Sequence, residues 1–428
     1  MNEFYALLIE NPISFIIILI LTTFFYCILF RRYLFSFFDP FTLSIIYSVF
    51  ATSVVSFMSF YGVINKFHIA HFYMSQFAFF IGFFIFKPFK FPEFNKQNIG
   101  FKNDSKIFLI LSIISFILYA GSTLISWKSV GIPILQDSRL GIYADSGGLG
   151  VLERVISICK PILIIFVIQR FLKKKINLLV LCMFCFLVLE SVLSGSRTSL
   201  FEIVFISFFY ILFSSSQDIY LKNKVKNIQK YFSLIAIIGV VVILMLKISD
   251  AITFKYAILA IGSRFLNSGD IFMYSYTTNV LNELHQYSGF YALFKDLFGF
   301  TRMIPYNNLP PSLGIEIYKH THVNPIENIG PNSRHNIFGL FYWGLMGSIV
   351  FSFVIGIITS FVRNKLVILL PKKGMLGLTI YTLLYPLANI RVDPTLAVKA
   401  LTNILFIFIP IFIISTILSS KNETKKKA

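Results

Sequence analysis

Residues 13–30 read ISFIIILILTTFFYCILF, a run that contains no charged side chain. An α-helix needs about 20 predominantly apolar residues to cross the hydrocarbon core of a bilayer. A secretory signal peptide would carry a basic segment before such a run and a small-x-small cleavage site after it, and both are absent here. The run therefore predicts a membrane helix that stays in the protein.

Similar apolar runs recur along the whole chain, which has 428 residues, 56% of them hydrophobic and 13% charged. Soluble domains carry about 25% charged residues. We therefore predict an all-α fold: a polytopic integral membrane protein with about 11 transmembrane helices in a single membrane-embedded domain over residues 1–428. The expected helices cover approximately residues 13–30, 41–61, 70–86, 107–126, 150–169, 176–194, 199–213, 232–248, 335–361, 375–390 and 396–417.

Basic residues gather in the loops that alternate crossings place on one face of the membrane. These loops are residues 31–32, 87–106, 170–175, 221–230 and 363–373, with the tail after Lys421. By the positive-inside rule this face is cytoplasmic, so we expect the N-terminus outside and the C-terminus in the cytoplasm. The net charge of +19 then reflects membrane orientation, and we expect no nucleic-acid partner.

One extracytoplasmic connection, residues 249–334, is much longer than the others, and a connection of that length is rarely without function. Within it, residues 271–298 show the pattern of one or two amphipathic helices. Their apolar faces would lie on the outer leaflet or line a lipid-facing groove. Residues 305–311, PYNNLPP, are rich in proline and predict an irregular loop.

Two short patterns have the spacing of metal or redox sites but lack the surrounding chemistry. Cys182 and Cys185 have apolar neighbours, whereas reactive thiols need an accessible, electropositive site. His320 and His322 form a His-x-His pair without a carboxylate or cysteine set at standard spacing. The P-loop pattern is absent. We expect no metal, no cofactor and no nucleotide-driven pump.

Arginines outside the cytoplasmic loops form a second charge pattern. They are Arg139, Arg154, Arg197, Arg264, Arg302, Arg334 and Arg391. Any cation serves membrane orientation, whereas the planar fork of arginine binds phosphate or carboxylate through two hydrogen bonds. The alternative is that these side chains anchor helix ends by snorkelling to the interface. As a group on one side of the membrane, they favour binding of an anionic substrate.

Lys160, Glu190 and Glu202 place charge inside apolar runs, which is costly and marks candidates for function. Glu190 and Glu202 flank the turn at Arg197, so either carboxylate could steady Arg197 or pair with Lys160. We favour structural pairing over substrate binding or direct catalysis.

The stretch 331–339, PNSRHNIFG, joins the long loop to an apolar helix. A helix N-terminus presents free N–H groups that favour anions, and a neutral histidine there can take a proton from an attacking hydroxyl. His335 is therefore the candidate general base, with Arg334 and Asn336 beside it for substrate binding. The alternative is an interfacial histidine that only hydrogen-bonds the backbone.

Arginines that neutralise a pyrophosphate leaving group, a histidine base and the absence of an energy-coupling motif fit one kind of reaction. It is a transfer from a donor that is already activated in the membrane. A lipid-diphosphate-linked saccharide meets that description.

Residues 334–336, RHN, followed by residues 344–347, GLMG, resemble the His-Asn…Gly-x-x-Gly segment of the O-antigen ligase and polymerase superfamily. The turn at residues 194–199, SGSRTS, resembles the Ser-x-Arg turn of Wzy-type O-antigen polymerases. The expected architecture, with a large extracytoplasmic loop late in the chain, is similar to that of these proteins over nearly the whole length.

This resemblance implies a metal-independent glycosyltransferase with a fold similar to the GT-C class. It would polymerise undecaprenyl-diphosphate-linked oligosaccharide repeat units into a surface polysaccharide, such as lipopolysaccharide O-antigen, on the outer face of the bacterial cytoplasmic (inner) membrane. A chain-length regulator would be its protein partner.

By motif match, the resemblance implies that Arg197 and Arg334 contact the diphosphate and that His335 is the base. Arg264, Arg302 and Arg391 match no motif, and we include them as substrate-binding residues because the expected topology puts them on the same side of the membrane.

Three other functions stay open at this point. An O-antigen ligase would transfer finished glycan to a lipid core or protein. A lipid-linked oligosaccharide flippase or other secondary transporter would move the substrate, and such proteins often have paired halves and broken midplane helices, which the sequence does not indicate. A structural membrane protein is the third alternative.

Overall fold

The structure is a computed structural model that describes residues 2–36, 39–89, 101, 103–135, 150–213, 230–231, 234, 262–263, 265–305, 308–322, 325, 329–371 and 374–427. Within these ranges every regular element is a helix and no strand occurs. The all-helical class predicted from the sequence is therefore confirmed.

Five of the described helices are long and apolar enough to cross a membrane, which makes this a multi-pass membrane protein by length and composition. They are Pro12–Phe30, Pro40–Phe60, Asp104–Leu135, His335–Leu369 and Pro394–Ser420. Leu178–Leu193 and Phe201–Tyr210 are shorter apolar helices. The span expected at 232–248 lies almost entirely outside the described residues, and the eleven-helix topology stays a prediction.

The chain divides into two compact units, each assembled from segments that are distant in sequence. The first unit comprises Met1–Pro88, Ile252–Lys365 and Pro386–Lys399. The second comprises Phe89–Ala251, Leu366–Tyr385 and Ala400–Ala428. The sequence predicts one membrane-embedded domain and gives no sign of this division, because the boundaries at 385/386 and 399/400 fall inside apolar runs that each predict a single helix.

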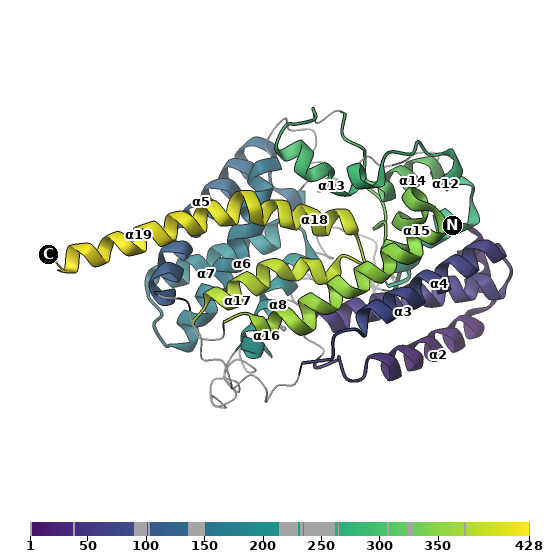
Figure 1. The fold of residues 1–428 in the computed structure, drawn as a ribbon, viewed down its shortest axis with the longest axis horizontal. Coiled ribbons are helices and arrows are strands. Elements are labelled where there is room, and N and C mark those ends of the chain that lie inside the picture. The colour runs from purple at the N-terminus through teal and green to yellow at the C-terminus, as the bar shows by residue number, and fades with distance from the viewer. Residues whose placement is uncertain are drawn as a thin grey trace. The chain divides into compact units, whose positions relative to one another are not determined.

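Long helices form the body of the first unit. They are α1 (Asn2–Glu10), α2 (Pro12–Phe30), α3 (Pro40–Phe60), α4 (Lys66–Phe83) and α15 (His335–Ser360). Figure 1 shows α2, α3, α4 and α15 next to one another. The side chains of Asp39 and Asn65 accept hydrogen bonds from the first free N–H groups of α3 and α4, so polar residues between the apolar runs set where these helices begin.

Two glycines allow α4 and α15 to touch through their backbones. A Cβ at Gly82 would collide with the carbonyl oxygen of Phe353, and a Cβ at Gly356 would collide with that of Phe79. Small residues permit such close approach in membranes, where packing and hydrogen bonds hold helices together. The contact fixes the C-terminal end of α4 against α15.

Shorter elements complete the first unit. They are η3 (Asn267–Gly269), α11 (Asp270–Thr277), α12 (Val280–Glu283), α13 (Gly289–Phe300), α14 (Leu313–Thr321) and the π-helical η5 (Phe361–Leu366). The amphipathic segment expected at 271–298 is thus divided among α11, α12 and α13. Only α13 exposes a large apolar side chain, Phe290. In contrast, residues 271–276 of α11 are all buried, and the helix packs against α3 and against α4, where Phe272 contacts Phe72.

Arg363 is a cation whose environment differs from the one that the sequence suggests. The expected topology puts it among the solvated basic residues of the 363–373 loop. Its side chain is fully buried and forms an ion pair with Asp39, and its Nη2 donates to the carbonyl oxygen of Tyr33 at 2.7 Å. Arg363 therefore contributes to the packing of the first unit around Asp39 and Tyr33.

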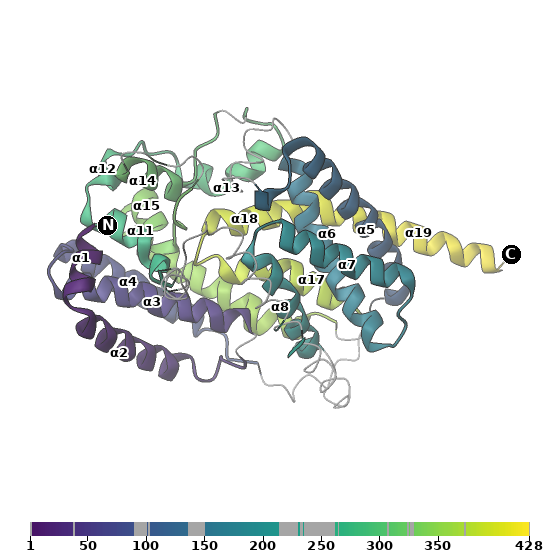
Figure 2. The same cartoon turned by 180° about the vertical axis from the view of Figure 1, so that it is seen from behind.

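Helices also form the second unit. They are α5 (Asp104–Val130), η2 (Pro133–Leu135), α6 (Gly150–Leu172), α7 (Leu178–Leu193), α8 (Arg197–Phe213), α16 (Val367–Leu369), α17 (Leu376–Leu384), the π-helical η7 (Ile404–Phe408) and α19 (Ile409–Lys427). In Figure 2, α5, α6, α7 and α8 form one group. Asp104 accepts hydrogen bonds from the backbone N–H groups of Met375 and Leu376, which ties the start of α5 to the start of α17. The remaining elements, η6 (Tyr385–Asn389) and α18 (Pro394–Asn403), pass from one unit into the other.

Candidate functional site

The helix α15 is broken at Gly344, which has φ +68° and ψ −170°. Residues on the two sides of this break contact each other. A Cβ at Gly339 would lie 2.8 Å from the Cα of Ser348, and His335 Nδ1 lies 2.8 Å from Ser352 Oγ. Residues 335–343 therefore fold back, antiparallel, against residues 345–360.

This fold-back places residues 334–336 in the interior of the first unit. At the rise of an α-helix, residues 335–343 extend about 14 Å, which is half of a bilayer core or less. Arg334, His335 and Asn336 are 8%, 3% and 1% exposed. The sequence correctly predicts a helix start at His335, but it suggests a position at the membrane surface, because an uninterrupted helix would have crossed from there.

His335 is held by one hydrogen bond and one ring contact. Its Nδ1 is paired with Ser352 Oγ, and its ring stacks on Phe79 with a centroid distance of 5.2 Å. No described residue forms a hydrogen bond with Nε2. The charges of Arg334 and Arg391 both act on the imidazole. The ring is therefore fixed in orientation, and its second nitrogen is left for another partner.

Asn336 connects the fold-back to α4 and α11. Its Nδ2 donates to Ser75 Oγ at 2.7 Å, and its carbonyl oxygen accepts from Ser348 Oγ at 3.1 Å. Ser348 Oγ also pairs with His71 Nε2 at 2.8 Å, and His71 Nδ1 pairs with the Tyr276 hydroxyl at 2.8 Å. Each of the side chains in this hydrogen-bonded series therefore has a partner, as buried polar side chains require.

Arg334 carries a buried charge and a strained backbone. Its φ of +41° is unusual for a residue with a side chain. Nε donates to the carbonyl oxygen of Ser268 at 2.9 Å and Nη2 to that of Tyr47 at 3.4 Å, while the guanidinium lies 5.8 Å from the Phe272 ring centroid. Among the described residues no carboxylate lies within ion-pair distance of Arg334, although the charge of Asp270 acts on it from further away.

Arg391 and Val392 are connected to His335 and Arg334 through backbone hydrogen bonds. The backbone N–H of His335 donates to the carbonyl oxygen of Arg391 at 3.1 Å, and that of Arg334 donates to Val392 at 3.0 Å. The Arg391 guanidinium donates twice to Ser44 Oγ, at 2.6 and 3.2 Å. It also lies 5.3 and 5.6 Å from the ring centroids of Phe41 and Phe79. We call Arg334, His335 and Arg391 the arginine–histidine centre.

The structure brings four of the predicted site residues together, namely Arg334, His335, Asn336 and Arg391. Arg302 is exposed at the end of α13, with φ +52°, and takes no part in this centre. Arg264 lies outside the described residues. The roles of all of these residues stay predictions.

Arg197 begins α8 and belongs to the second unit. Its side chain lies outside the described residues. The predicted partnership of Arg197 with Arg334 therefore stays a prediction too.

A different charged cluster lies in the second unit. Lys160 Nζ is 2.6 Å from Glu190 Oε2 and 4.0 Å from Glu202 Oε2, and it also donates to Ser199 Oγ. The Tyr119 hydroxyl donates to the same oxygen of Glu190 at 2.8 Å. The structural pairing that the sequence favoured for Glu190 and Lys160 is present. We call Lys160, Glu190, Glu202 and Tyr119 the lysine–glutamate centre.

Sequence reasoning missed the polar residues that surround His335. His71 and Ser75 are one helical turn apart on α4, and Ser348 and Ser352 are one turn apart on α15. A polar pair at this spacing inside an apolar run marks one face of a helix. That spacing was the available signal for a polar contact between the two helices.

No group of three His, Cys, Asp or Glu side chains in the described part of the chain is arranged to hold a metal ion. No protein-family model matches the chain, and no curated protein or solved structure is significantly similar to it. The arginine–histidine centre is therefore the candidate functional site. Its two guanidinium groups can bind and stabilise an anion, and the imidazole of His335 can exchange a proton.

Proposed function

We propose that this protein is a membrane-embedded glycosyltransferase that extends a polysaccharide from undecaprenyl-diphosphate-linked repeat units. The observation that carries the proposal is the arginine–histidine centre, in which two buried guanidinium groups lie close to a histidine whose Nε2 has no hydrogen-bond partner among the described residues. A diphosphate leaving group is the kind of anion that such a centre would bind.

The charge of Arg334 is the first support. A buried cation without a carboxylate in contact is costly, and none of the described carboxylates is within ion-pair distance of Arg334. A diphosphate would complete this charge balance and would accept hydrogen bonds from the planar guanidinium. Positive groups fixed in advance stabilise the charge that develops on a leaving group without further rearrangement.

In the proposed reaction, His335 accepts the proton that the acceptor hydroxyl loses. The acceptor hydroxyl attacks the anomeric carbon of the donor sugar, a new glycosidic C–O bond forms, and the bond from that carbon to the diphosphate oxygen breaks. The hydroxyl proton passes to His335 Nε2, and the negative charge stays on the polyprenyl diphosphate beside Arg334 and Arg391. Ser352 holds the other nitrogen of the imidazole and so orients Nε2.

We assign the Gly344 turn, the 249–334 loop and the N-terminus to the outer face of a bacterial cytoplasmic membrane, with the C-terminus in the cytoplasm. The positive-inside rule supports this orientation. A GT-C-like mechanism and a chain-length regulator as partner belong to the same proposal, as do supporting contacts from Arg197, Arg264 and Arg302.

Deletion of the gene tests the proposal. Loss of a polymerase leaves single repeat units attached at the cell surface, which a gel of the surface glycan resolves. Loss of a ligase leaves no attached glycan. Loss of a flippase also leaves none, with repeat units trapped inside the cell.

Histidine variants test the site. We expect His335→Ala, made at normal levels, to give only single repeat units. The matched control is His320→Ala, because His320 is exposed and its ring bonds only to a carbonyl oxygen of its own helix. Full-length chains from His335→Ala would overturn the assignment of the base.

Secondary transport is a second candidate that one observation favours. Transporters place substrate near the middle of the membrane at the ends of interrupted helices, and α15 begins at His335, about half a bilayer core away from its break at Gly344. Trapped internal repeat units in the deletion strain would select this function over polymerisation.

A further inference from the structure

A groove opens on the side of the first unit, between α2 and α4, with α3 as its floor. It is a cavity of about 480 Å³, a size typical of sites for small molecules. Leu21, Phe25 and Phe77 on its rim are more than half exposed, and α2, which carries the first two, is long and apolar enough to cross a membrane. The groove is therefore open to the hydrocarbon core of the membrane.

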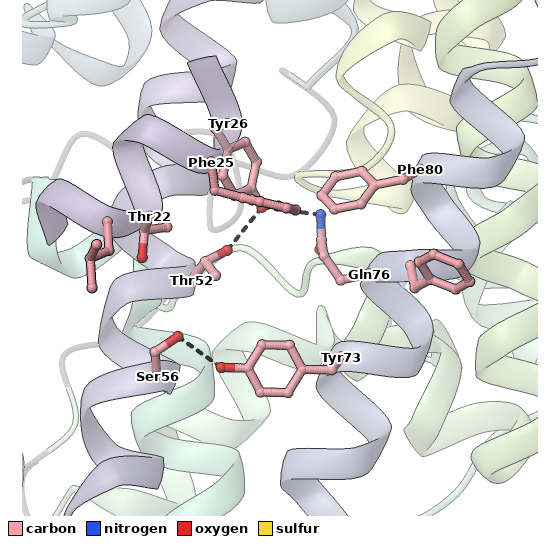
Figure 3. Close-up of a pocket in the computed structure, with 10 residues that line it drawn as sticks. Thr22, Phe25, Tyr26, Thr52, Ser56, Tyr73, Gln76 and Phe80 are labelled. Atoms are coloured by element: carbon pink, nitrogen blue, oxygen red, sulfur yellow. Dashed lines mark hydrogen bonds between the residues drawn. The ribbon is translucent and has the colours of Figure 1, made fainter. Parts of the chain in front are cut away.

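The polar groups in the groove bind each other. The Tyr26 hydroxyl is paired with Thr52 Oγ1 at 2.9 Å and accepts from Gln76 Nε2 at 3.3 Å. Ser56 and Tyr73 share a hydrogen bond of 2.8 Å. Figure 3 shows these bonds, which join Tyr26 on α2 to both α3 and α4 and join Ser56 on α3 to Tyr73 on α4. Because these groups are satisfied internally, what remains for a ligand is mainly apolar and aromatic surface.

One end of the groove is closed by aromatic rings. Tyr26 packs on Phe80 at a centroid distance of 5.7 Å, and Phe30 packs on Phe80 and Phe83 at 5.7 and 5.2 Å. These contacts join α2 to α4 below the groove. A chain that lies in the groove must therefore end there or turn inward past Tyr26.

Aromatic rings connect this closed end to Arg391 of the arginine–histidine centre. Phe30 packs on Tyr26 and on Phe41 at centroid distances of 5.9 and 5.8 Å, and the Arg391 guanidinium lies 5.3 Å from the Phe41 ring centroid. Tyr26 thus lies between an apolar groove and a cationic centre within the same unit. A ligand that satisfies both features carries a hydrocarbon chain and an anionic head.

We propose that the groove binds the hydrocarbon chain of a polyprenyl diphosphate whose head lies at Arg334 and Arg391. The choice of a polyprenyl chain rests on the proposed function, and one further observation favours it. Aromatic side chains supply half of its lining, and their faces contact the C–H groups and double bonds of isoprene units.

Two adjacent threonines on α2 give a matched pair of variants. Thr22 lines the groove and Thr23 does not. Each hydroxyl donates only to the carbonyl oxygen one turn earlier, that of Ile18 for Thr22 and that of Leu19 for Thr23. Thr22→Trp fills the groove without breaking a bond between helices, and Thr23→Trp adds the same side chain on an exposed position.

The experiment measures binding of undecaprenyl diphosphate to the full-length protein in nanodiscs of zwitterionic phospholipid. We expect Thr22→Trp to weaken binding by about tenfold or more, which corresponds to about 1.4 kcal/mol, and Thr23→Trp to bind as the wild type does. Inorganic pyrophosphate, a head without a chain, should bind equally to all three proteins. Ser56→Phe fills the groove from α3 and should repeat the effect if Thr22→Trp does not fold.

Equal binding of undecaprenyl diphosphate by wild type, Thr22→Trp and Ser56→Phe would overturn the groove as the chain site. Retention of a phospholipid in place of the probe would overturn the choice of occupant. Neither result touches the proposed function, which fails separately if the deletion strain still makes full-length glycan.

Discussion

The two units each bury a cluster of charge inside apolar helices, but the clusters differ in how that charge is balanced. In the lysine–glutamate centre, Lys160 contacts Glu190 directly and Glu202 lies 4.0 Å away, so carboxylates of the protein neutralise the cation. In the arginine–histidine centre, Arg334 has two backbone carbonyl oxygens and an aromatic ring as neighbours, with no described carboxylate in contact. The charge of the first cluster is neutralised within the protein, whereas the second cluster is suited to bind an anion.

This difference separates two roles that look alike in sequence. Any charge in a membrane helix is a candidate for function, and both clusters qualify by that criterion. The two clusters differ in the groups that contact the buried cation. A cation paired within the protein mainly contributes to folding, and a cation paired only with carbonyl groups is suited to binding.

The largest effect is expected from breaking the pair in the second unit. Glu190→Ala leaves Lys160 without its nearest carboxylate and should lower the free energy of unfolding by about 3 kcal/mol. The double variant Lys160→Met with Glu190→Gln removes both charges, keeps an acceptor for Tyr119 and should restore most of the stability. Thermal unfolding in detergent measures both, and a Glu190→Ala protein as stable as the wild type would contradict the structural role.

A somewhat smaller effect is expected from the contact that fixes Phe79, on which His335 stacks. Gly356→Leu forces α15 away from α4 and should cost about 1–3 kcal/mol through overpacking. Gly121→Leu on α5 is the control, because a Cβ there meets nothing within 4 Å. Unfolding temperatures should separate the two variants, and equal values would show that the glycine contact is not required.

A loss of about 1 kcal/mol is expected from Ser352→Ala, which removes the partner of His335 Nδ1. Glycan length should fall more than stability does, because the imidazole loses its orientation. Ser415→Ala is the matched control in the second unit, since that buried hydroxyl donates only to the carbonyl oxygen of Ile411 in its own helix. Glycan of normal length from Ser352→Ala would show that Ser352 does not position His335.

The smallest effect concerns Lys295, a cation of the first unit that lies outside the membrane-spanning helices. Its Nζ donates to Ser312 Oγ at 2.8 Å, and burial lowers the pKa of its ammonium group from the usual 10.5. The folded protein then binds fewer protons than the unfolded chain between the lowered pKa and 10.5, so stability rises with pH in that window. Lys295→Met should flatten this rise in unfolding temperature, and an unchanged slope would show that Lys295 is not its source.

The sequence predicts the helical membrane class because apolar runs and their polar boundaries are local features. Asp39 and Asn65 mark helix starts in the sequence and cap those helices in the structure. The fold-back at Gly344 is not predictable in the same way. A glycine within an apolar run is equally compatible with a continuous membrane helix, and the reversal is evident only from contacts such as those of Gly339 with Ser348 and of His335 with Ser352.

The site is predictable in part for the same reason. Arg334, His335 and Asn336 are adjacent in sequence, so their joint position follows from the motif. Arg391 joins them through backbone hydrogen bonds between two irregular segments, and no local pattern encodes that pairing.

The most direct test of the account compares the two centres in living cells through the surface glycan. A strain that lacks the gene receives either Arg334→Lys, which keeps the charge but loses the planar fork, or the double variant Lys160→Met with Glu190→Gln, each at wild-type protein level. The account predicts single repeat units from Arg334→Lys and full-length chains from the double variant. Full-length chains from Arg334→Lys together with single units from the double variant would contradict it.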